Sequence, residues 1–130
     1  MSVTLPYTEI IKWDTEIIPN FQLWEAACKC GCGLVILDPE LLAALWEVRV
    51  EFGEPVTATS WCRCPDHNRN EGGKPDSYHP CGKAVDLKPA RGRMFDRFIE
   101  LCRKHFPFVI VYATFCHCDM RGNRGIGEAL

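Results

Sequence analysis

Two histidines and an aspartate are the residues of this sequence best suited to hold a metal ion. His79 ends a long polar stretch, Asp86 follows seven positions later on the polar side of a predicted strand, and His117 lies in another predicted strand. Strand periodicity places Asp119 on the same face as His117 and the neighbouring cysteines on the other face. Two imidazoles and one carboxylate suit zinc, and three protein ligands leave a fourth position open for water, as in catalytic sites. Two simpler interpretations stay open: a solvated loop histidine at 79 and a buried aspartate at 86 that pairs with a cation.

A helix with clear start and stop signals precedes these residues. Asp38 is a suitable N-cap, Pro39 suits the first helical position, and Gly53 follows as a stop signal. Between Pro39 and Gly53 apolar residues recur at helical spacing, which predicts an amphipathic helix. A second amphipathic helix is predicted over residues 94–106.

Four short strands are predicted around these helices. β-branched or alternating residues indicate strands over residues 55–60, 83–88, 108–112 and 114–120. Val85 and Leu87 face one side of their strand, and Asp86 faces the other. Residues 62–80 read as a long polar loop, and a loop of that length inside a compact domain is usually functional.

The order of these elements predicts an α+β fold, with a small antiparallel sheet flanked by helices that pack on one side. A chain of 130 residues is the size of a single domain. Residues 1–20 read as an N-terminal arm with one short strand or helix, and residues 123–130 as a mobile tail. We expect a monomer.

Composition excludes several classes of protein. Hydrophobic residues make up 47% and charged residues 25%, as in globular proteins. Fifteen basic residues against 17 acidic ones, a net charge of −2, argue against a nucleic-acid partner. No stretch approaches the roughly 18 apolar residues of a membrane span, so we expect no membrane insertion. The N-terminus lacks the apolar core of a signal peptide, so we expect synthesis in the cytoplasm.

The chain contains nine cysteines, an odd number, which we expect to be reduced in the cytoplasm. Three of them stand in the pattern C-x-C-x-C (Cys28, Cys30, Cys32) and two in C-x-C (Cys62, Cys64). Structural zinc sites favour two to four residues between paired cysteines, so this spacing is a weaker metal signal. A second, structural metal and an adventitious disulfide stay open beside the favoured interpretation of small buried hydrophobic residues, above all for Cys102, Cys116 and Cys118.

The segment from Ser77 to Asp86 resembles the Ser-x-His-x-x-Gly-x-Ala-x-Asp signature of the zinc D-Ala-D-Ala carboxypeptidases and endolysin peptidases of the M15 family. The chain looks most like the short phage and prophage branch of that family. Further matching stretches are Cys28-Lys29-Cys30-Gly31-Cys32-Gly33, Thr59-Ser60-Trp61-Cys62-Arg63-Cys64-Pro65, His67-Asn68, Gly72-Gly73, and His117-x-Asp119-x-Arg121-Gly122. The resemblance implies the fold shared with the hedgehog signalling domain, with the metal on the face of the sheet.

The resemblance also implies roles for individual residues. His79, Asp86 and His117 resemble the zinc ligands of the family. Arg63 resembles an arginine that steadies the substrate or the transition state, and its alternative is a surface arginine beside a turn. Ser77 resembles a serine that contacts the substrate, and its alternative is an N-cap or turn residue.

The catalytic base departs from the family pattern. Many relatives have a glutamate three residues before the last histidine ligand, and others a histidine two residues before it, where this chain has Thr114 and Phe115. Asp119 is the nearest titratable group on that strand, so we nominate it as the base. Its alternative is a carboxylate that orients a histidine ligand. If neither holds, the acidic loop residues Glu71 and Asp76 come next.

The resemblance implies a zinc-dependent peptidase that cleaves peptidoglycan stem peptides, as a D-Ala-D-Ala carboxypeptidase or an endopeptidase. Such a protein fits a phage or prophage cell-wall hydrolase that is released from the cytoplasm or carried in a phage particle. The alternative is a non-catalytic binding or structural module of a phage particle that keeps the fold and the zinc but lacks the base. His67 and His105 we interpret as structural or exposed, because a positive charge is favourable at the end of a helix such as that of His105.

Overall fold

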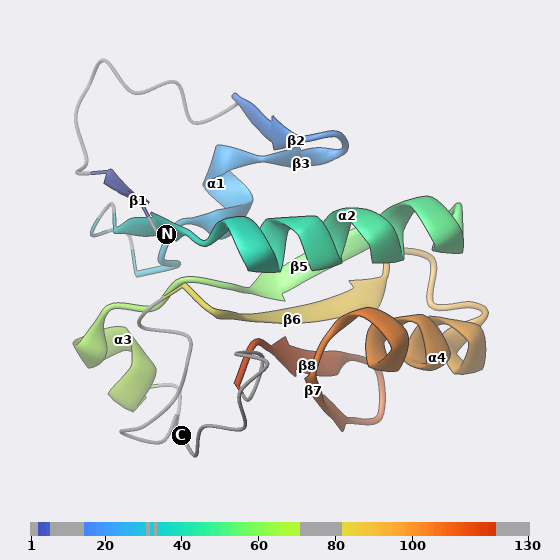
Figure 1. The fold of residues 1–130 in the computed structure, drawn as a ribbon. Coiled ribbons are helices and arrows are strands. Elements are labelled where there is room, and N and C mark those ends of the chain that lie inside the picture. The colour runs from blue at the N-terminus through green and yellow to red at the C-terminus, as the bar shows by residue number, and fades with distance from the viewer. Residues whose placement is uncertain (1–2, 6–14, 31, 33, 71–81, 122–130) are drawn as a thin grey trace.

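The computed structural model describes residues 3–5, 15–30, 32, 34–70 and 82–121, and shows a mixed arrangement of helices and antiparallel strands (Figure 1). The elements, in chain order, are β1 (Val3–Leu5), β2 (Glu16–Ile18), β3 (Phe21–Gln22), α1 (Leu23–Ala26), β4 (Val35–Leu37), α2 (Pro39–Phe52), β5 (Val56–Ser60), α3 (Pro65–Asn70), β6 (Ala84–Pro89), α4 (Phe95–His105), β7 (Phe108–Val111) and β8 (Cys116–Asp119). The predicted α+β class is confirmed.

Helix α2 begins and ends where the sequence signals predict. The buried Asp38 side chain accepts a hydrogen bond from the backbone N–H of Leu41 at 3.0 Å, and Pro39 occupies the first turn. Gly53 ends the helix with φ at 70°, in the left-handed region that glycine tolerates, and donates its N–H to the Arg49 carbonyl at 3.1 Å. The helix that precedes the central sheet is therefore fixed by local chemistry.

The main sheet has four strands in the order β5-β6-β8-β7, and every neighbouring pair is antiparallel. Two further pairs, β1 with β4 and β2 with β3, form small ribbons. Strands β7 and β8 follow each other through a tight turn, which the Tyr112 N–H closes by donating to the Phe115 carbonyl at 2.9 Å. Strand β6 lies between β5 and β8, so its residues are flanked by a strand on either side.

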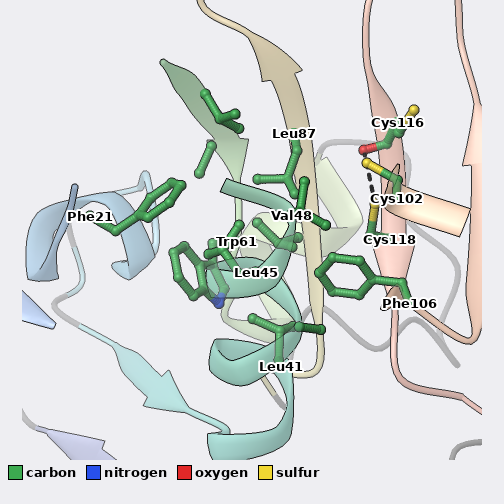
Figure 2. Close-up of a cluster of buried hydrophobic side chains, with 14 of the residues drawn as sticks. Phe21, Leu41, Leu45, Val48, Trp61, Leu87, Cys102, Phe106, Cys116 and Cys118 are labelled. Atoms are coloured by element: carbon green, nitrogen blue, oxygen red, sulfur yellow. Dashed lines mark hydrogen bonds between the residues drawn. The ribbon is translucent and has the colours of Figure 1, made fainter. Parts of the chain in front are cut away.

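Helices α2 and α4 pack on one face of this sheet and form the hydrophobic core with it (Figures 1 and 2). Val85 and Leu87 of β6 are fully buried there, together with Cys116 and Cys118 of β8. The predicted alternation is confirmed, because Val85, Leu87, Cys116 and Cys118 belong to the hydrophobic core, whereas Ala84 shares the other face of β6 with Asp86. The polar residues between them consequently lie on the opposite face.

Gly82 lies two residues before β6, at a place where a side chain does not fit. Its φ of +72° lies in the left-handed region, and a Cβ atom built there would stand 2.5 Å from the Ile36 carbonyl oxygen. The close approach joins the start of β6 to β4, four residues before Asp86. Glycine at this position is therefore required by both conformation and space.

The structure differs from the sequence prediction in several places, and β3, α1 and β4, which precede α2, were not predicted. Residues 65–70 within the predicted loop 62–80 form helix α3, and the predicted arm of residues 1–20 contributes strands that pair with β3 and β4. The predicted tail, residues 123–130, lies outside the described residues. Among the described helices, none is long and apolar enough to cross a bilayer.

Candidate metal-binding site

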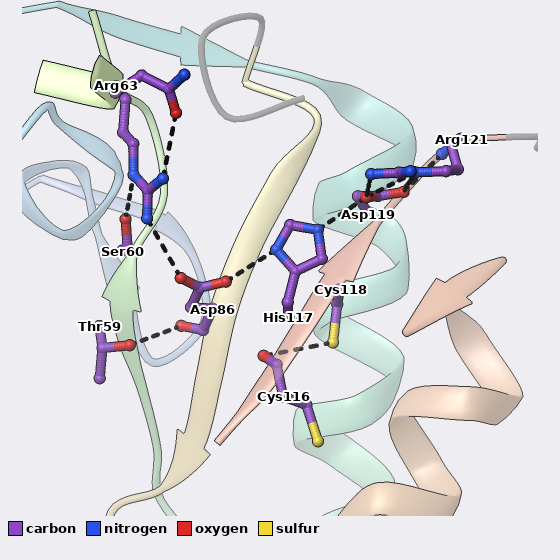
Figure 3. Close-up of polar contacts among 10 residues, drawn as sticks. Thr59, Ser60, Arg63, Asp86, Cys116, His117, Cys118, Asp119 and Arg121 are labelled. Carbon is purple, nitrogen blue, oxygen red and sulfur yellow. Dashed lines mark hydrogen bonds and ion pairs between the residues drawn. The ribbon is translucent and has the colours of Figure 1, made fainter. Parts of the chain in front are cut away.

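The register of the sheet brings the predicted site residues into one row. Ser60 of β5 pairs with Asp86 of β6, and Asp86 pairs with His117 of β8. An irregularity in β5 between Ala58 and Ser60 shifts the pairing by one residue, which a β-bulge does by adding one residue to one strand. The shift places Ser60, rather than Thr59, opposite Asp86 on the face away from the helices (Figure 3).

Asp86 and His117 point toward each other at the centre of this row. The Asp86 Oδ1 and His117 Nδ1 atoms lie 3.1 Å apart, and both side chains are largely buried, with 11% and 12% exposed. Ligand bonds of about 2.0 Å in a tetrahedron place two ligand atoms about 3.3 Å apart, so the pair fits two ligands of one zinc ion. The nitrogen and oxygen donors are also those that zinc accepts in catalytic sites.

Asp119 holds the other side of the His117 ring. Its carboxylate is completely buried and lies 2.8 Å from His117 Nε2. Arg121 donates to the same carboxylate from its backbone N–H at 3.0 Å and from Nη2 at 2.8 Å. A neutral imidazole that donates through Nε2 to Asp119 leaves its Nδ1 lone pair directed at Asp86, where a shared cation would sit.

The electrostatics of the row favour positive charge between the two carboxylates. Burial alone would lower the pKa of His117, but hydrogen bonds to Asp119 and Asp86 and the negative charges of both outweigh it and raise that pKa to about 9. Burial alone would raise the pKa of Asp119, but hydrogen bonds from His117 and Arg121 hold it below its ordinary value. The site therefore stabilises an anionic Asp119 and a cation beside Asp86.

Arg63 approaches the same carboxylate from the segment between β5 and α3. Its Nη2 lies 3.6 Å from Asp86 Oδ2, and its side chain is 12% exposed. Nε donates to Ser60 Oγ at 3.0 Å, and Nη1 donates to Oδ1 of the buried Asn68 in α3 at 3.2 Å. These contacts hold the guanidinium group over the row of Asp86 and His117 (Figure 3).

The structure thus brings four of the predicted site residues together: Arg63, Asp86, His117 and Asp119. The remaining ones, His79 and Ser77, lie outside the described residues, as do Glu71 and Asp76. His105 ends α4, where Nε2 lies 2.9 Å from Glu51 Oε1, and thus joins two helices away from the row.

Three residues of the site were not predicted from the sequence. They are Ser60 and Asn68, which hold Arg63, and Arg121, which holds Asp119. All three stand within stretches that match the family pattern, so a signal was present. Their partners could not be predicted, because the contacts depend on the bulge in β5 and on helix α3.

Seven of the eight cysteines within the described residues fall into two groups in space. Cys102, Cys116 and Cys118 are completely buried in the core, as predicted (Figure 2). A second group, Cys28, Cys30, Cys32 and Cys64, places its sulfur atoms within 4.8 Å of one another. Hydrogen bonds to the Cys30 sulfur, chiefly from Cys28, favour the Cys30 thiolate and lower its pKa to about 7.

The antiparallel sheet gathers a histidine and carboxylates on the face away from its helices, and these are donor groups that zinc sites use. The profile of a family described as Peptidase M15 matches residues 19–119. This chain belongs to the peptidase M15 family, as its resemblance to that family predicted, and is a peptidase by that membership. Neither the search of curated proteins nor the search of solved structures found a match.

Proposed function

We propose that this protein is a zinc-dependent peptidase that cleaves the stem peptides of peptidoglycan, as a D-Ala-D-Ala carboxypeptidase or an endopeptidase. The observation that carries the proposal is the pair of Asp86 and His117, 3.1 Å apart on the sheet of a peptidase-family chain. A phage or prophage cell-wall hydrolase, made in the cytoplasm and acting after release or from a phage particle, is the biological setting we propose.

Three residues would hold the zinc ion: His79, Asp86 and His117. Asp86 and His117 have the separation and the chemistry of two ligands, and the motif that contains Asp86 also contains His79. When bound, the ion supplies a Lewis acid for the scissile carbonyl and a nucleophilic water near neutral pH.

Arg63 is proposed to bind negative charge on the substrate or the transition state. Its guanidinium group stands beside Asp86 and is fixed by Ser60 and Asn68, so little side-chain freedom is lost when substrate binds. A planar guanidinium donates two parallel hydrogen bonds to a carboxylate or a developing oxyanion. Ser77 is proposed as a further substrate contact.

For Asp119 we favour the orienting role over the role of base. Its carboxylate is completely buried and already accepts hydrogen bonds from His117 and Arg121. A carboxylate that accepts from the distal nitrogen of a histidine ligand fixes the ring and its tautomer. A base must also reach a water near the substrate, and Asp119 faces the far side of the His117 ring from Asp86.

A second candidate is a non-catalytic zinc-containing module of a phage particle. This candidate is favoured because Thr114 and Phe115 stand where relatives have a catalytic glutamate or histidine. Thr114 is exposed there, and the ring of Phe115 stacks on Tyr112 with centroids 4.6 Å apart. Neither side chain takes up a proton, so these positions supply no base.

The test is hydrolysis of purified muropeptides by the zinc-loaded protein, with products identified by mass. We expect release of D-alanine or cleavage of a cross-link, loss of this activity with chelator, and its return with zinc. His117→Ala should abolish activity and lower the zinc content, whereas the control His105→Ala, on helix α4, should leave both unchanged. Zinc binding without cleavage of any muropeptide would support the non-catalytic module instead.

A further inference from the structure

Four cysteines from two distant parts of the chain meet on one side of the molecule. Cys28, Cys30 and Cys32 follow helix α1, and Cys64 precedes helix α3. The Cys28 and Cys30 sulfurs lie 3.3 Å apart, and those of Cys30 and Cys64 lie 3.6 Å apart. All four sulfur atoms lie within 4.8 Å of one another.

This spacing fits the corners of a tetrahedron around one ion. Zinc–sulfur bonds of about 2.3 Å place the sulfurs of a tetrahedral site with four cysteine ligands about 3.8 Å apart. Four soft thiolate ligands select zinc over magnesium or calcium, which prefer oxygen. The side chains of Cys30 and Cys32 are exposed, so an ion can reach the cluster from solvent.

Backbone hydrogen bonds hold the two segments in place without any ion. The N–H of Cys28 donates to the Leu34 carbonyl at 2.9 Å, which closes the segment that carries the first three cysteines. The N–H of Cys62 donates to the Ala26 carbonyl at 3.1 Å, which joins that segment to the one that carries Cys64. The Cys64 N–H donates to the Cys28 sulfur at 3.3 Å, a contact of the kind that stabilises metal-bound thiolates.

We propose that Cys28, Cys30, Cys32 and Cys64 bind one zinc ion, separate from the site on the sheet. The four protein ligands fill a tetrahedral coordination sphere, which is the arrangement of a structural rather than a catalytic site. Binding releases the remaining thiol protons to solvent and involves no change of oxidation state. The ion cross-links the segment after α1 to the segment that carries Arg63, which directly precedes Cys64.

The buried cysteines of the core provide the contrast. Cys102, Cys116 and Cys118 are completely buried among apolar side chains. Burial raises the pKa of the Cys118 thiol, so its thiolate is disfavoured. Cys102 is a matched control residue, because it is a thiol of the same chain that lies in the core and outside the cluster. Its loss should leave the metal content unchanged.

The experiment measures the zinc content of protein purified without oxygen, by elemental analysis. The double variant Cys30→Ser/Cys64→Ser should contain one zinc per chain fewer than the unaltered protein, and Cys102→Ala should contain the same number. Both residues of the double variant lie outside the hydrophobic core, and circular dichroism checks that the fold is kept.

Cobalt separates this site from the one on the sheet. Co²⁺ added to the apoprotein should produce thiolate-to-cobalt charge-transfer absorption and intense tetrahedral visible bands, which His117→Ala should retain and the double variant should lose. This outcome is independent of whether the protein cleaves any peptide. Equal zinc content in the double variant and the unaltered protein would overturn the proposal, as would a Cys30–Cys64 disulfide in protein isolated without oxygen.

Discussion

Replacing Asp119 by asparagine separates the two roles considered for this residue. Asparagine has nearly the same shape, but its amide offers one accepting oxygen where the carboxylate offers two. In the structure Oδ2 accepts from His117 Nε2 and from Arg121 Nη2 at 2.8 Å each, and Oδ1 accepts from the backbone N–H of Arg121 at 3.0 Å. In Asp119→Asn the amide nitrogen therefore faces a donor on one side, and the His117 ring loses its anionic partner.

The expected loss of zinc affinity follows from the loss of this anionic partner of His117. Removing the group that orients a histidine ligand costs about 10- to 100-fold in metal affinity, which corresponds to about 1.4 to 2.7 kcal/mol of binding free energy. Activity measured at limiting zinc should fall in parallel and recover in part when zinc is raised. A general base behaves differently, because its loss lowers the rate about 10²-fold or more without changing metal affinity.

The assay is competition with a chelator of known zinc affinity, run beside muropeptide hydrolysis at saturating zinc. Arg121→Gln is the matched control, because it removes a hydrogen-bond partner of Asp119 and leaves the contact between Asp119 and His117 in place. We expect its effect on zinc affinity to be smaller than that of Asp119→Asn. Unchanged zinc affinity with a large loss of rate in Asp119→Asn would refute the orienting role and establish the base. Unchanged affinity and unchanged rate would refute both roles.

Two further predictions concern substrate binding and the fold. Arg63→Ala should lower kcat/KM at least tenfold, about 1.4 kcal/mol of transition-state stabilisation, with zinc content unchanged, and Arg63→Lys should recover only part of it because a lysine cannot donate two parallel hydrogen bonds. Wild-type kcat/KM in Arg63→Ala would show that the residue only pairs with Asp86. Gly82→Ala should lower the free energy of unfolding by about 3 kcal/mol or more, since its strain adds to a clash with Ile36. Gly53→Ala has a similar positive φ but open space around it, so it should cost only about 1–2 kcal/mol in urea unfolding; equal losses in the two variants would contradict the steric argument.

Local signals were sufficient to predict the elements around the site. The N-cap Asp38 and the stop at Gly53 predicted helix α2, because capping depends only on residues a few positions apart. The alternation in β6 and β8 predicted which side of the sheet carries Asp86 and His117, because the side-chain period of a strand is fixed.

The contacts that hold the site residues could not be predicted in the same way. Helix α3 has six residues in a polar stretch without apolar periodicity, so tertiary contacts must stabilise it. Asn68 supplies such a contact through its hydrogen bond to Arg63. Likewise the two roles of Asp119 are equivalent in the sequence, and only its burial and its contact with Arg121 favour one of them.

The cysteine cluster shows how spacing in the sequence misleads when ligands come from different segments. The C-x-C pattern counts against a zinc site if each pair must chelate the ion by itself. In the fold Cys30 and Cys64, 34 residues apart, bring their sulfurs to 3.6 Å, so the pair that matters is not adjacent in sequence. The entropic cost of closing a loop grows only slowly with its length, by about 0.6 kcal/mol for each doubling. The backbone hydrogen bond from Cys62 to Ala26 already closes the loop between the two cysteine segments.

Arg63 is therefore held from both directions along the chain. Before it, the irregularity in β5 sets Ser60 opposite Asp86, and the Ser60 hydroxyl accepts from the arginine. After it, the Cys64 N–H is bound to the Cys28 sulfur. When both the backbone and the guanidinium group of an arginine are restrained, little entropy is lost on binding a substrate. Its hydrogen bonds then contribute more of their energy to binding. The proposed zinc ion would extend this restraint to the backbone around Arg63, because the carbonyl of its ligand Cys64 accepts the Asn68 N–H at 2.9 Å and Asn68 in turn holds Arg63.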